Sequence, residues 1–343
     1  MKRSLAAAVA SFAALQPAAE AAEAAGIDRV WATELRARDV MIRALYMAAA
    51  TSRLQVGTGI AYAFTRHPLA MAAAAVEGQA ASGGRFTIGI GAGTPHTRGE
   101  FGLSFDHPAA RLAEYAEIMR RAVDTEDGLD FHGRFYDITM PGFRFGHPRE
   151  LLDSVCIYGA ALNPLTVTTL SRICDGLALH PFGHWQGYLA DIALPSLKRG
   201  AADNPRGAPA LATWIIACAL PDAGRARRLA RAQIALYAAQ PGFASFFETT
   251  PWATTAERIR NRAHLGSGPT DWAGLGEELV TDDLLDGVAI AGSADEVADR
   301  VMEKERELED LGVDELTLQI PGVALPVSET QEILSSLVSA VSR

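Results

Sequence analysis

The sequence has few cysteines and a shortage of basic residues. Its three cysteines, Cys156, Cys174 and Cys218, are odd in number and widely spaced, and no CxxC pair indicates zinc. We therefore expect buried, reduced thiols in a cytoplasmic protein. Lys and Arg number 31 against 41 Asp and Glu, which gives a formal charge of -10. This acidic excess argues against nucleic acid or an anionic membrane as a partner.

Long, strongly apolar runs are also lacking. No stretch approaches the roughly 18 apolar residues that a transmembrane helix needs. The amino-terminal segment MKRSLAAAVASFAALQPAAEA has the basic start and apolar stretch of a signal peptide. Its apolar part, however, is mostly alanine and continues without a break into the next segment. We therefore expect a first strand, Ser4–Val9, followed by a helix with Pro17 in its first turn.

The motifs of several enzyme classes are missing. The sequence contains no G-x-S-x-G elbow, no P-loop and no Cys/His pair with a local signature. No carboxylate lies at metal-ligand spacing from the histidines, so we expect no metal site. Paired carboxylates for glycoside hydrolysis stay open, but the sequence singles out no pair.

Hydrophobic residues make up 49% of the 343 residues, which is enough for a large core. Eight short apolar runs are expected to be strands: Ser4–Val9, Ile27–Ala32, Leu54–Ile60, Phe86–Gly91, Ser154–Gly159, Gly176–His180, Leu211–Ala219 and Val313–Ile320. The helical stretches between and after them include Asp39–Ala50, Pro68–Ala81, Pro108–Val123, Pro164–Arg172, Trp185–Lys198, Ala223–Ala238 and Thr330–Val341. Strands without polar alternation suit a parallel sheet covered by helices. Eight repeats of strand and helix indicate a (β/α)8 barrel, with an open doubly wound sheet as the alternative.

Two segments are too long to be plain connections. Asp130–Pro148 follows the fourth helix, and Gln240–Asp286 follows the seventh. We expect such insertions to shape or cover a site. Their aromatic residues form either an apolar pocket wall or ordinary packing; they include Phe131, Phe135, Phe143 and Trp252.

Barrel enzymes carry their sites at the carboxyl ends of the strands. After the third strand, Gly57 and Gly59 would allow a flat ligand to approach closely, or would serve a bulge or barrel packing. After the fourth strand, Gly89, Gly91 and Gly93 do not meet the G-x-G-x-x-G spacing of a dinucleotide loop. They are better evidence for a surface against which a planar ring can lie.

The segment after the fifth strand is a candidate anion site. Asn163 can cap a helix and Pro164 suits its first position. The exposed amides of such a helix start attract an anion without Lys or Arg, which suits an acidic protein that holds one phosphate. An ordinary capped helix is the simpler interpretation.

Several histidines lie near the predicted strand ends. His180 and His184 follow the sixth strand, and His67, His96 and His107 are further candidates for the rim. Histidine can act as an acid or a base near neutral pH. For each of them, a structural or hydrogen-bonding role is the alternative.

Together these segments resemble the bacterial luciferase-like superfamily of flavin and deazaflavin oxidoreductases. The resemblance is carried in order by AEAAGIDRVWATE, AAATSRLQVGTGIAYAFTRHPLAMA, ASGGRFTIGIGAG, HPAARLAEYAEIMRRA, LDFHGRFYDI, CDGLALHPF and AGSADEVADRV, and it covers nearly the whole chain. It is strongest for the branch that uses the deazaflavin coenzyme F420, in which DFHGRFY-like and LHPF-like segments are familiar.

The resemblance implies one barrel domain over residues 1–343, with an isoalloxazine-like ring in its mouth. It also implies a non-proline cis peptide at the end of the third strand, matched here by Gly59–Ile60. A fourth-strand loop would flank the ring, and the helix start after the fifth strand would hold the cofactor phosphate. The residues thus implied in cofactor binding are Gly59, Ile60, Ala61, Gly91, Ala92, Gly93, Thr94, Gly159, Ala160, Ala161, Leu162 and Asn163.

The sequence departs from the family at the position of a histidine. Several deazaflavin enzymes of the superfamily carry a histidine just after the second strand, where Leu35 stands here beside Glu34. An acidic residue that some relatives carry after the fourth strand also has no clear match. Glu34, His96 and His180 are the candidate catalytic residues that remain, and Glu34 has a structural alternative.

These observations give one leading hypothesis and two rivals. The leading one is a cytoplasmic oxidoreductase that transfers a hydride between coenzyme F420 and a small or medium organic substrate. One rival is an FMN-dependent monooxygenase of the same superfamily. The other is an inactive barrel that serves as a binding or structural subunit, which the leucine at position 35 supports. Relatives are usually dimers, so we expect a homodimer.

Overall fold

The structure is a computed structural model that describes residues 1–7, 11–35, 37–103, 106–264, 270–323 and 325–342. It divides into two compact units. The first consists of Met1–Val30, Leu179–Ala193 and Leu211–Arg343, and the second of Trp31–Ala178 and Leu194–Ala210. The organisation of the chain as one domain stays a prediction.

The strands of the main sheet have a circular order. They are β1 (Lys2–Ala7), β2 (Arg29–Ala32), β3 (Gln55–Thr58), β4 (Ala61–Tyr62), β5 (Phe86–Gly91), β8 (Cys156–Ala161), β9 (Gly176–Leu179), β10 (Ala210–Ala219), β11 (Ala289–Gly292) and β12 (Glu315–Gln319). The order is β11-β10-β12-β1-β2-β3-β5-β8-β9, β9 also pairs with β10, and β4 pairs with β5. The register is parallel in pairs such as β1 with β12 and β5 with β8. This is the strand order of a (β/α)8 barrel, so the predicted fold class is confirmed.

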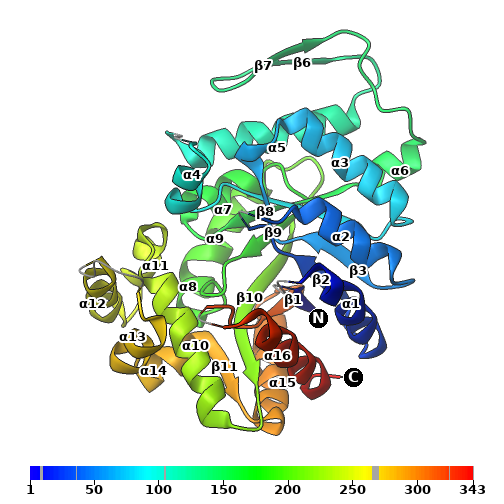
Figure 1. Ribbon diagram of the computed structural model, residues 1–343. Coiled ribbons are helices and arrows are strands. Elements are labelled where there is room, and N and C mark those ends of the chain that lie inside the picture. The colour runs from blue at the N-terminus through cyan, green and yellow to red at the C-terminus, as the bar shows by residue number, and fades with distance from the viewer. Residues whose placement is uncertain (8–10, 36, 104–105, 265–269, 324, 343) are drawn as a thin grey trace. The chain divides into compact units, whose positions relative to one another are not determined.

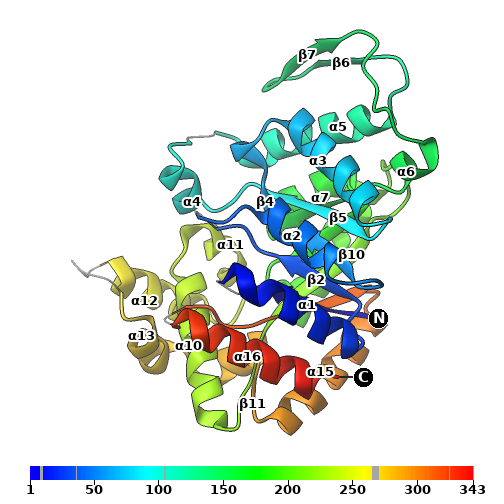
Figure 2. The ribbon, with the colours of Figure 1, turned by 45° about the vertical axis from the view of Figure 1, so that its right-hand side comes forward.

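The first unit carries the helices at both ends of the chain (Figure 1). They are η1 (Phe12–Ala14), α1 (Leu15–Ala24), α8 (Gln186–Tyr188), η3 (Leu189–Ala193), α10 (Ala223–Ala238), η4 (Pro241–Phe243), α11 (Ala244–Phe247), α12 (Ala253–His264), α13 (Trp272–Leu279), α14 (Asp282–Val288), α15 (Ala294–Asp310) and α16 (Val327–Ala340). Figure 2 shows α16 lying beside α1 and α15, so the last helix packs against the first.

The second unit carries the helices between β2 and β9, together with α9. They are α2 (Val40–Ala49), η2 (Ala63–Thr65), α3 (Pro68–Ala81), α4 (Pro95–Glu100), α5 (Pro108–Asp124), α6 (Arg149–Asp153), α7 (Pro164–Ser171) and α9 (Leu194–Ala201). A separate hairpin joins β6 (Leu129–His132) to β7 (Asp137–Met140) in antiparallel register. It lies against α5 (Figures 1 and 2), where the Glu114 carboxylate accepts hydrogen bonds from the Arg134 and Phe135 amides, each at 2.8 Å.

The two predicted insertions are present, and their aromatic side chains pack within the fold. Phe131 of the hairpin is buried beneath the guanidinium of Arg121 on α5. The second insertion folds into η4 and α11–α14, where Trp252 is buried and its indole N–H donates to Asp283. Of the two interpretations offered by the sequence, ordinary packing therefore applies to Phe131 and Trp252.

The predicted strands and helices agree closely with the observed ones, apart from three omissions among the strands and several among the helices, including α15 (Ala294–Asp310). The bounds of β5, α3 and α10 match those predicted. The first strand begins two residues earlier than expected, and the end of the prediction, residues 8 and 9, lies outside the described residues. The omissions among the strands are the short β4 and β11 and the hairpin, whose segments were expected to be turns or connections. A strand of two to four residues is too short to show a hydrophobic period.

The helical stretch predicted over Trp185–Lys198 is present as an unbroken succession of α8, the π-helical η3 and α9. Only the π-helical turn in its middle was not predicted. Pro195 lies in the first turn of α9 and has no N–H to donate to the preceding turn. A proline inside a helical pattern breaks the regular ladder, and a π-helical turn is one way of absorbing the break.

Four helices of the second unit begin on a proline. Pro68, Pro95, Pro108 and Pro164 are the first residues of α3, α4, α5 and α7. At this position the missing N–H costs nothing, because the first amides of a helix have no intrahelical partner. The proline ring also presets the helical φ angle, so these residues fix where each helix starts.

Cys156, Cys174 and Cys218 form no disulfide among the described residues. Cys174 and Cys218 are buried, and Cys156 is half-buried. Burial raises the pKa of the Cys174 thiol, and it raises the pKa of the Cys218 thiol to about 12. Both thiols are therefore protonated and unreactive at neutral pH.

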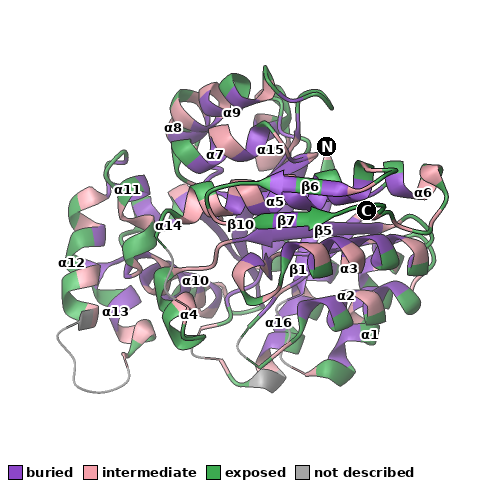
Figure 3. Cartoon of the chain, turned by 90° about the horizontal axis from the view of Figure 1, so that it is seen from above, coloured by how far each residue is buried: buried purple, intermediate pink, exposed green. Residues whose placement is uncertain are grey.

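A buried ion pair occupies the polar face of β12. Strands such as β1 and β5 are buried almost throughout (Figure 3), and β12 is buried at every position. Glu315 accepts hydrogen bonds from Arg29 Nη1 at 2.5 Å and from the Ser4 hydroxyl at 2.6 Å. The side chains of Arg29 and Glu315 are only 5% and 2% exposed, so each charge depends on the other for compensation.

We predict that breaking this pair costs more than replacing it. Arg29→Met should lower the free energy of unfolding by about 3 kcal/mol, because a buried carboxylate loses its cation. The double variant Arg29→Met/Glu315→Leu should recover much of that loss, since neither charge then remains. Chemical denaturation of the wild type and both variants measures this. A double variant no more stable than Arg29→Met would contradict the prediction.

Candidate functional site

The structure brings together three of the segments that the sequence predicts to bind a cofactor, all in the second unit. Strand β4 pairs with β5 through Ala61 opposite Ile90 and Tyr62 opposite Gly91. Strand β5 pairs with β8 through Ile90 opposite Gly159. The carboxyl ends of β4, β5 and β8 are therefore neighbours, and the segments 59–61, 91–94 and 159–163 follow one another across the sheet.

The Gly59–Ile60 peptide is cis, as the resemblance predicts. The Ile60 side chain lies against Gly91 so closely that a Cβ on Gly91 would be 2.1 Å from Ile60 Cδ1 and 3.2 Å from the Ala160 Cβ. Glycine at position 91 is therefore required by the close approach of these neighbours. The contact also ties segment 59–61 to the ends of β5 and β8.

The loop after β5 turns through Gly93 into α4. Gly93 has a φ of +68°, a left-handed conformation that glycine adopts without strain. Thr94 caps α4 by accepting a hydrogen bond from the Thr97 amide at 3.2 Å. Ala92, Gly93 and Ala160 are half-buried and carry little or no side chain. The strand ends therefore present accessible backbone, against which a planar ring can lie.

Gly159 has a different reason to be glycine. A Cβ there would be 2.7 Å from Leu170 Cδ1 and 3.2 Å from Cys174 Sγ, both of which lie on or just beyond α7. The absent side chain therefore faces the helix layer and permits close packing of β8 on α7. Only the backbone of Gly159 is available for the predicted binding role.

The start of α7 is capped and open to solvent. The Asn163 side-chain oxygen accepts hydrogen bonds from the amide and the hydroxyl of Thr166, at 2.8 and 2.9 Å. Asn163, Pro164 and Leu165 are exposed, and Leu165 is 67% exposed. The positive end of the helix dipole therefore faces solvent, where it can attract an anion.

Glu34 follows β2 and forms a network of hydrogen bonds with Tyr62 and Arg66, which follow the cis peptide in the chain. Its carboxylate accepts from the Tyr62 amide at 2.6 Å and pairs with both terminal nitrogens of Arg66, at 2.6 and 3.0 Å. Arg66 also donates to Asp39 at 2.8 Å, and Asp39 caps α2 through the Met41 and Ile42 amides. The pKa of Arg66 is raised, chiefly by its hydrogen bond to Glu34.

This network gives Glu34 a structural role. Its side chain is only 6% exposed, and both carboxylate oxygens accept hydrogen bonds. The Arg66 carbonyl accepts a hydrogen bond from the Tyr115 hydroxyl at 3.1 Å, which extends the network to α5. The carboxylate thus holds segment 59–66 in place, while its catalytic role stays a prediction. Leu35, where relatives have the histidine, is 46% exposed.

The histidines differ sharply in environment. His96 on α4 is exposed and lies 3.2 Å from Glu100 one turn later. In the first unit, the His180 ring lies 4.0 Å from the Phe243 ring and 4.7 Å from the Tyr237 ring, centre to centre, and burial lowers its pKa to about 3. His180 is therefore neutral at physiological pH. Catalytic roles for His96 and His180 stay predictions.

Sequence reasoning missed Arg66, Tyr62 and Arg98. Tyr62 packs edge-on against Phe101, with ring centres 6.1 Å apart, and its ring borders Gly93. Arg98 reaches back from α4 to the Gly93 carbonyl. The signal that could have indicated the two arginines is their position: each follows a barrel strand by a few residues, in an acidic protein where cations are scarce.

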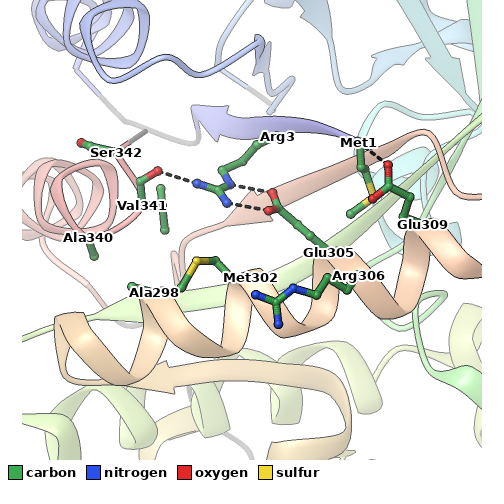
Figure 4. A pocket seen from close by; sticks show the side chains of 10 residues that line it. All are labelled: Met1, Arg3, Ala298, Met302, Glu305, Arg306, Glu309, Ala340, Val341 and Ser342. Carbon is green, nitrogen blue, oxygen red and sulfur yellow. Dashed lines mark hydrogen bonds and ion pairs between the residues drawn. The ribbon is translucent and has the colours of Figure 1, made fainter.

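A cavity of about 610 Å³ lies elsewhere, between β1, α15 and α16 in the first unit (Figure 4). The Arg3 guanidinium points between the Glu305 carboxylate and the Val341 carbonyl, with each contact at 2.6 Å. The cavity lies at the amino end of β1, whereas barrel sites lie at the carboxyl ends of strands. Arg3 pairs with Glu305 and the amino terminus pairs with Glu309 at this cavity, so we assign these contacts a structural role.

Among the described residues, no group of three or more His, Cys, Asp or Glu side chains could hold a metal ion. No helix within the described ranges is long and apolar enough to cross a membrane.

Comparison with known proteins finds one family model and several similar proteins that cover most of the chain. The sequence profile of the family described as luciferase-like monooxygenase matches residues 2–315. An uncharacterized protein of Mycobacterium tuberculosis is 29% identical over 290 residues, covering 82% of this chain and 83% of its own. The 5,10-methylenetetrahydromethanopterin reductase of Methanolobus tindarius is 25% identical over 308 residues, covering 88% and 89%. The structure of the coenzyme F420-dependent tetrahydromethanopterin reductase of Methanopyrus kandleri superimposes with a TM-score of 0.77 at 21% identity, covering 99% and 98%, which shows the shared fold.

We predict that Glu34 is needed for stability. Glu34→Ala removes the acceptor for the Tyr62 amide and for Arg66, so the free energy of unfolding should fall by about 2 kcal/mol. Glu34→Gln retains an acceptor oxygen and should lose less. Glu77→Ala is the matched control, because Glu77 is 71% exposed and should change stability little. Chemical denaturation measures all three, and the same midpoint for Glu34→Ala and the wild type would refute the prediction.

We also predict a pH-dependent loss of stability from His184. Its side chain is buried, and burial, with a smaller effect of the nearby Lys304 charge, lowers its pKa from 6.5 to about 3. Between these values the unfolded chain binds a proton that the folded chain does not, so stability falls as the pH falls. From pH 7 to pH 5 this one residue should cost about 2 kcal/mol.

The variant His184→Gln removes this titration. Its free energy of unfolding should fall less than that of the wild type over the same pH interval, whatever its stability at pH 7. Denaturant titrations of both proteins at pH 7, 6 and 5 measure the difference. Parallel pH profiles would show that the folded protein takes up a proton at His184 as readily as the unfolded chain does.

Proposed function

The chain belongs to the luciferase-like monooxygenase family, and on that premise we propose that it is an oxidoreductase that binds coenzyme F420 and exchanges a hydride with a small or medium organic substrate. The reductase of Methanolobus tindarius supports an enzyme of this kind. A mycobacterial relative named as a putative coenzyme F420-dependent oxidoreductase, 27% identical over 295 residues, supports the cofactor.

The observation that carries the proposal is the junction of segments 59–61, 91–94 and 159–163. The Ile60 side chain lies against Gly91, and the small residues Ala92, Gly93 and Ala160 at the same strand ends are half-buried. This surface fits a flat ring, because backbone and small side chains allow close approach over a wide area. When bound, the deazaflavin ring supplies the hydride chemistry, and the protein supplies orientation.

Each segment would have a separate part in holding the cofactor. Segment 59–61 and the loop 91–94 would contact the ring. The amides at Leu162 and Asn163 and the exposed start of α7 would hold the phosphate through the helix dipole. Glu34 and Arg66 would act indirectly, because their hydrogen bonds keep segment 59–66 in position.

The proton donor is a separate question from the cofactor. Among the predicted candidates, Glu34 is engaged by Arg66 and Tyr62, and His180 is neutral in an aromatic environment. His96 is exposed on the helix that follows the loop 91–94. We therefore propose His96 as the candidate best placed to exchange protons with solvent.

A homodimer in the cytoplasm is the remaining part of the proposal. Ile42 and Tyr46 are one turn apart on α2 and are 60% and 37% exposed. An apolar surface of this kind is typical of an interface. A second copy of the chain is the occupant that we propose for it.

The proposal predicts cofactor preference and a defined phosphate contact. Purified protein titrated separately with F420 and with FMN should bind F420 more tightly. Leu165→Asp places a carboxylate in the exposed first turn of α7, where it favours the helix dipole but repels an anion. F420 affinity should fall at least tenfold, or about 1.4 kcal/mol, without loss of thermal stability.

Leu165→Asn is the matched control, because it has nearly the same shape as aspartate and no charge. It should bind F420 as the wild type does. Tight binding of FMN with none of F420 would favour the FMN-dependent monooxygenase instead, and binding of neither would favour the inactive barrel. Equal F420 affinities for Leu165→Asp and Leu165→Asn would exclude the start of α7 as the phosphate contact.

A further inference from the structure

Arg98 stands beside the predicted ring-binding loop. It lies on α4, and its Nη1 donates a hydrogen bond to the Gly93 carbonyl at 2.7 Å, with a longer contact of 3.5 Å to the Ala92 carbonyl. Its backbone carbonyl accepts from the Leu103 amide at 2.8 Å, which closes the turn after α4. Among the described residues, the hydrogen bonds of the guanidinium all go to backbone carbonyls of the loop 91–94.

No described carboxylate forms an ion pair with Arg98. Its side-chain hydrogen bonds go to two carbonyl oxygens, and within the described ranges no Asp or Glu oxygen lies within 4.0 Å of its nitrogens. Arg66, the other arginine of the site, is the opposite case, since Glu34 and Asp39 neutralise it. Burial lowers the pKa of Arg98, whereas the carboxylates raise the pKa of Arg66.

The N–H groups of Arg98 that do not contact the two carbonyl oxygens are suited to binding an anion. Arginine has five N–H donors arranged in a planar fork, and the two carbonyl contacts use only Nη1. The fork matches the paired oxygens of a phosphate or a carboxylate. Because the described partners of Arg98 are carbonyl oxygens, its positive charge is left to favour an anionic ligand at the loop 91–94.

We propose that Arg98 binds an anionic group in the side chain of the ring cofactor, as a second anchor besides the start of α7. The inference rests on the proposed function, because it assumes that a flavin-type ring lies on the loop 91–94. In F420 the side chain offers a phosphodiester and carboxylates, and both share the chemistry that an arginine fork recognises. Arg98 would thereby couple the tail of the cofactor to the loop that carries its ring.

The test compares three deazaflavins that share one ring. They are F420 with its glutamate tail, the form that ends before the glutamates, and the ribityl deazaflavin without phosphate. Each is titrated by fluorescence into the wild type, Arg98→Gln and Arg98→Lys. Arg98→Gln should raise the Kd for F420 about tenfold and leave the Kd of the phosphate-free form unchanged, with Arg98→Lys in between.

The glutamate-free form identifies the bound group. If its Kd also rises in Arg98→Gln, the contact is to the phosphodiester region; if only F420 is affected, the contact is to the glutamate carboxylates. Either result supports the proposal. Raising the salt concentration should also weaken F420 binding more in the wild type than in Arg98→Gln, because an ion pair is screened.

Two controls separate this role from a structural one. Glutamine at position 98 can still donate to the Gly93 carbonyl, so the melting temperature should not change. Arg121→Gln removes the same charge from an exposed site on α5 and should leave every Kd unchanged. Equal F420 affinity in the wild type and Arg98→Gln would overturn the inference, and so would an equal loss for the phosphate-free form.

Failure of the proposed function has a different signature. If the wild type binds FMN but none of the deazaflavins, the cofactor proposal fails, and FMN with riboflavin then tests Arg98 in the same way. If the wild type binds neither kind of ring, both proposals fail. If it binds F420 and the Arg98 variants bind F420 equally well, only the role of Arg98 fails.

Discussion

The candidate site depends on the carboxylate of Glu34, which joins the end of β2 to the segment that contains Tyr62 and Arg66. Glu34 receives the Tyr62 amide and both terminal nitrogens of Arg66. Because Arg66 also reaches Asp39, and its carbonyl receives the Tyr115 hydroxyl, the same network joins the end of β2, the cap of α2 and the body of α5. Removing Glu34 would leave a backbone amide and a guanidinium to find new partners, and the segment that borders Gly91 would lose its fixed position.

Two arginines near the strand ends show how local charge works in an acidic protein. Arg66 is surrounded by carboxylates and contributes structure. Arg98 has only carbonyl partners among the described residues and keeps its charge available. The overall negative field would repel an anionic ligand at long range, so any binding of one must come from short-range contacts such as Arg98 and the start of α7.

The sequence was informative where the signal was periodic or where a residue has a narrow repertoire. Prolines marked the starts of α3 and α7, and apolar runs located the barrel strands within a few residues. It was uninformative for β11, a four-residue strand with no period of its own, and for the π-helical turn η3 inside a helical stretch that was otherwise predicted.

For the candidate site, the segments could be predicted but their internal contacts could not. Gly91 and Gly159 looked alike in sequence, yet one accommodates Ile60 and the other admits Leu170 from the helix layer. The pairing of Glu34 with Arg66 joins residues 32 positions apart, and no local pattern reports such a contact. The prolines at the starts of α3, α4, α5 and α7 have a further consequence, which concerns the unfolded chain. Each removes conformations that its segment would otherwise explore before folding, worth about 0.5 kcal/mol apiece. The proline rings therefore restrict the backbone at these four helix starts even in the unfolded chain. Ligand binding near them then requires little free energy for ordering the helix starts.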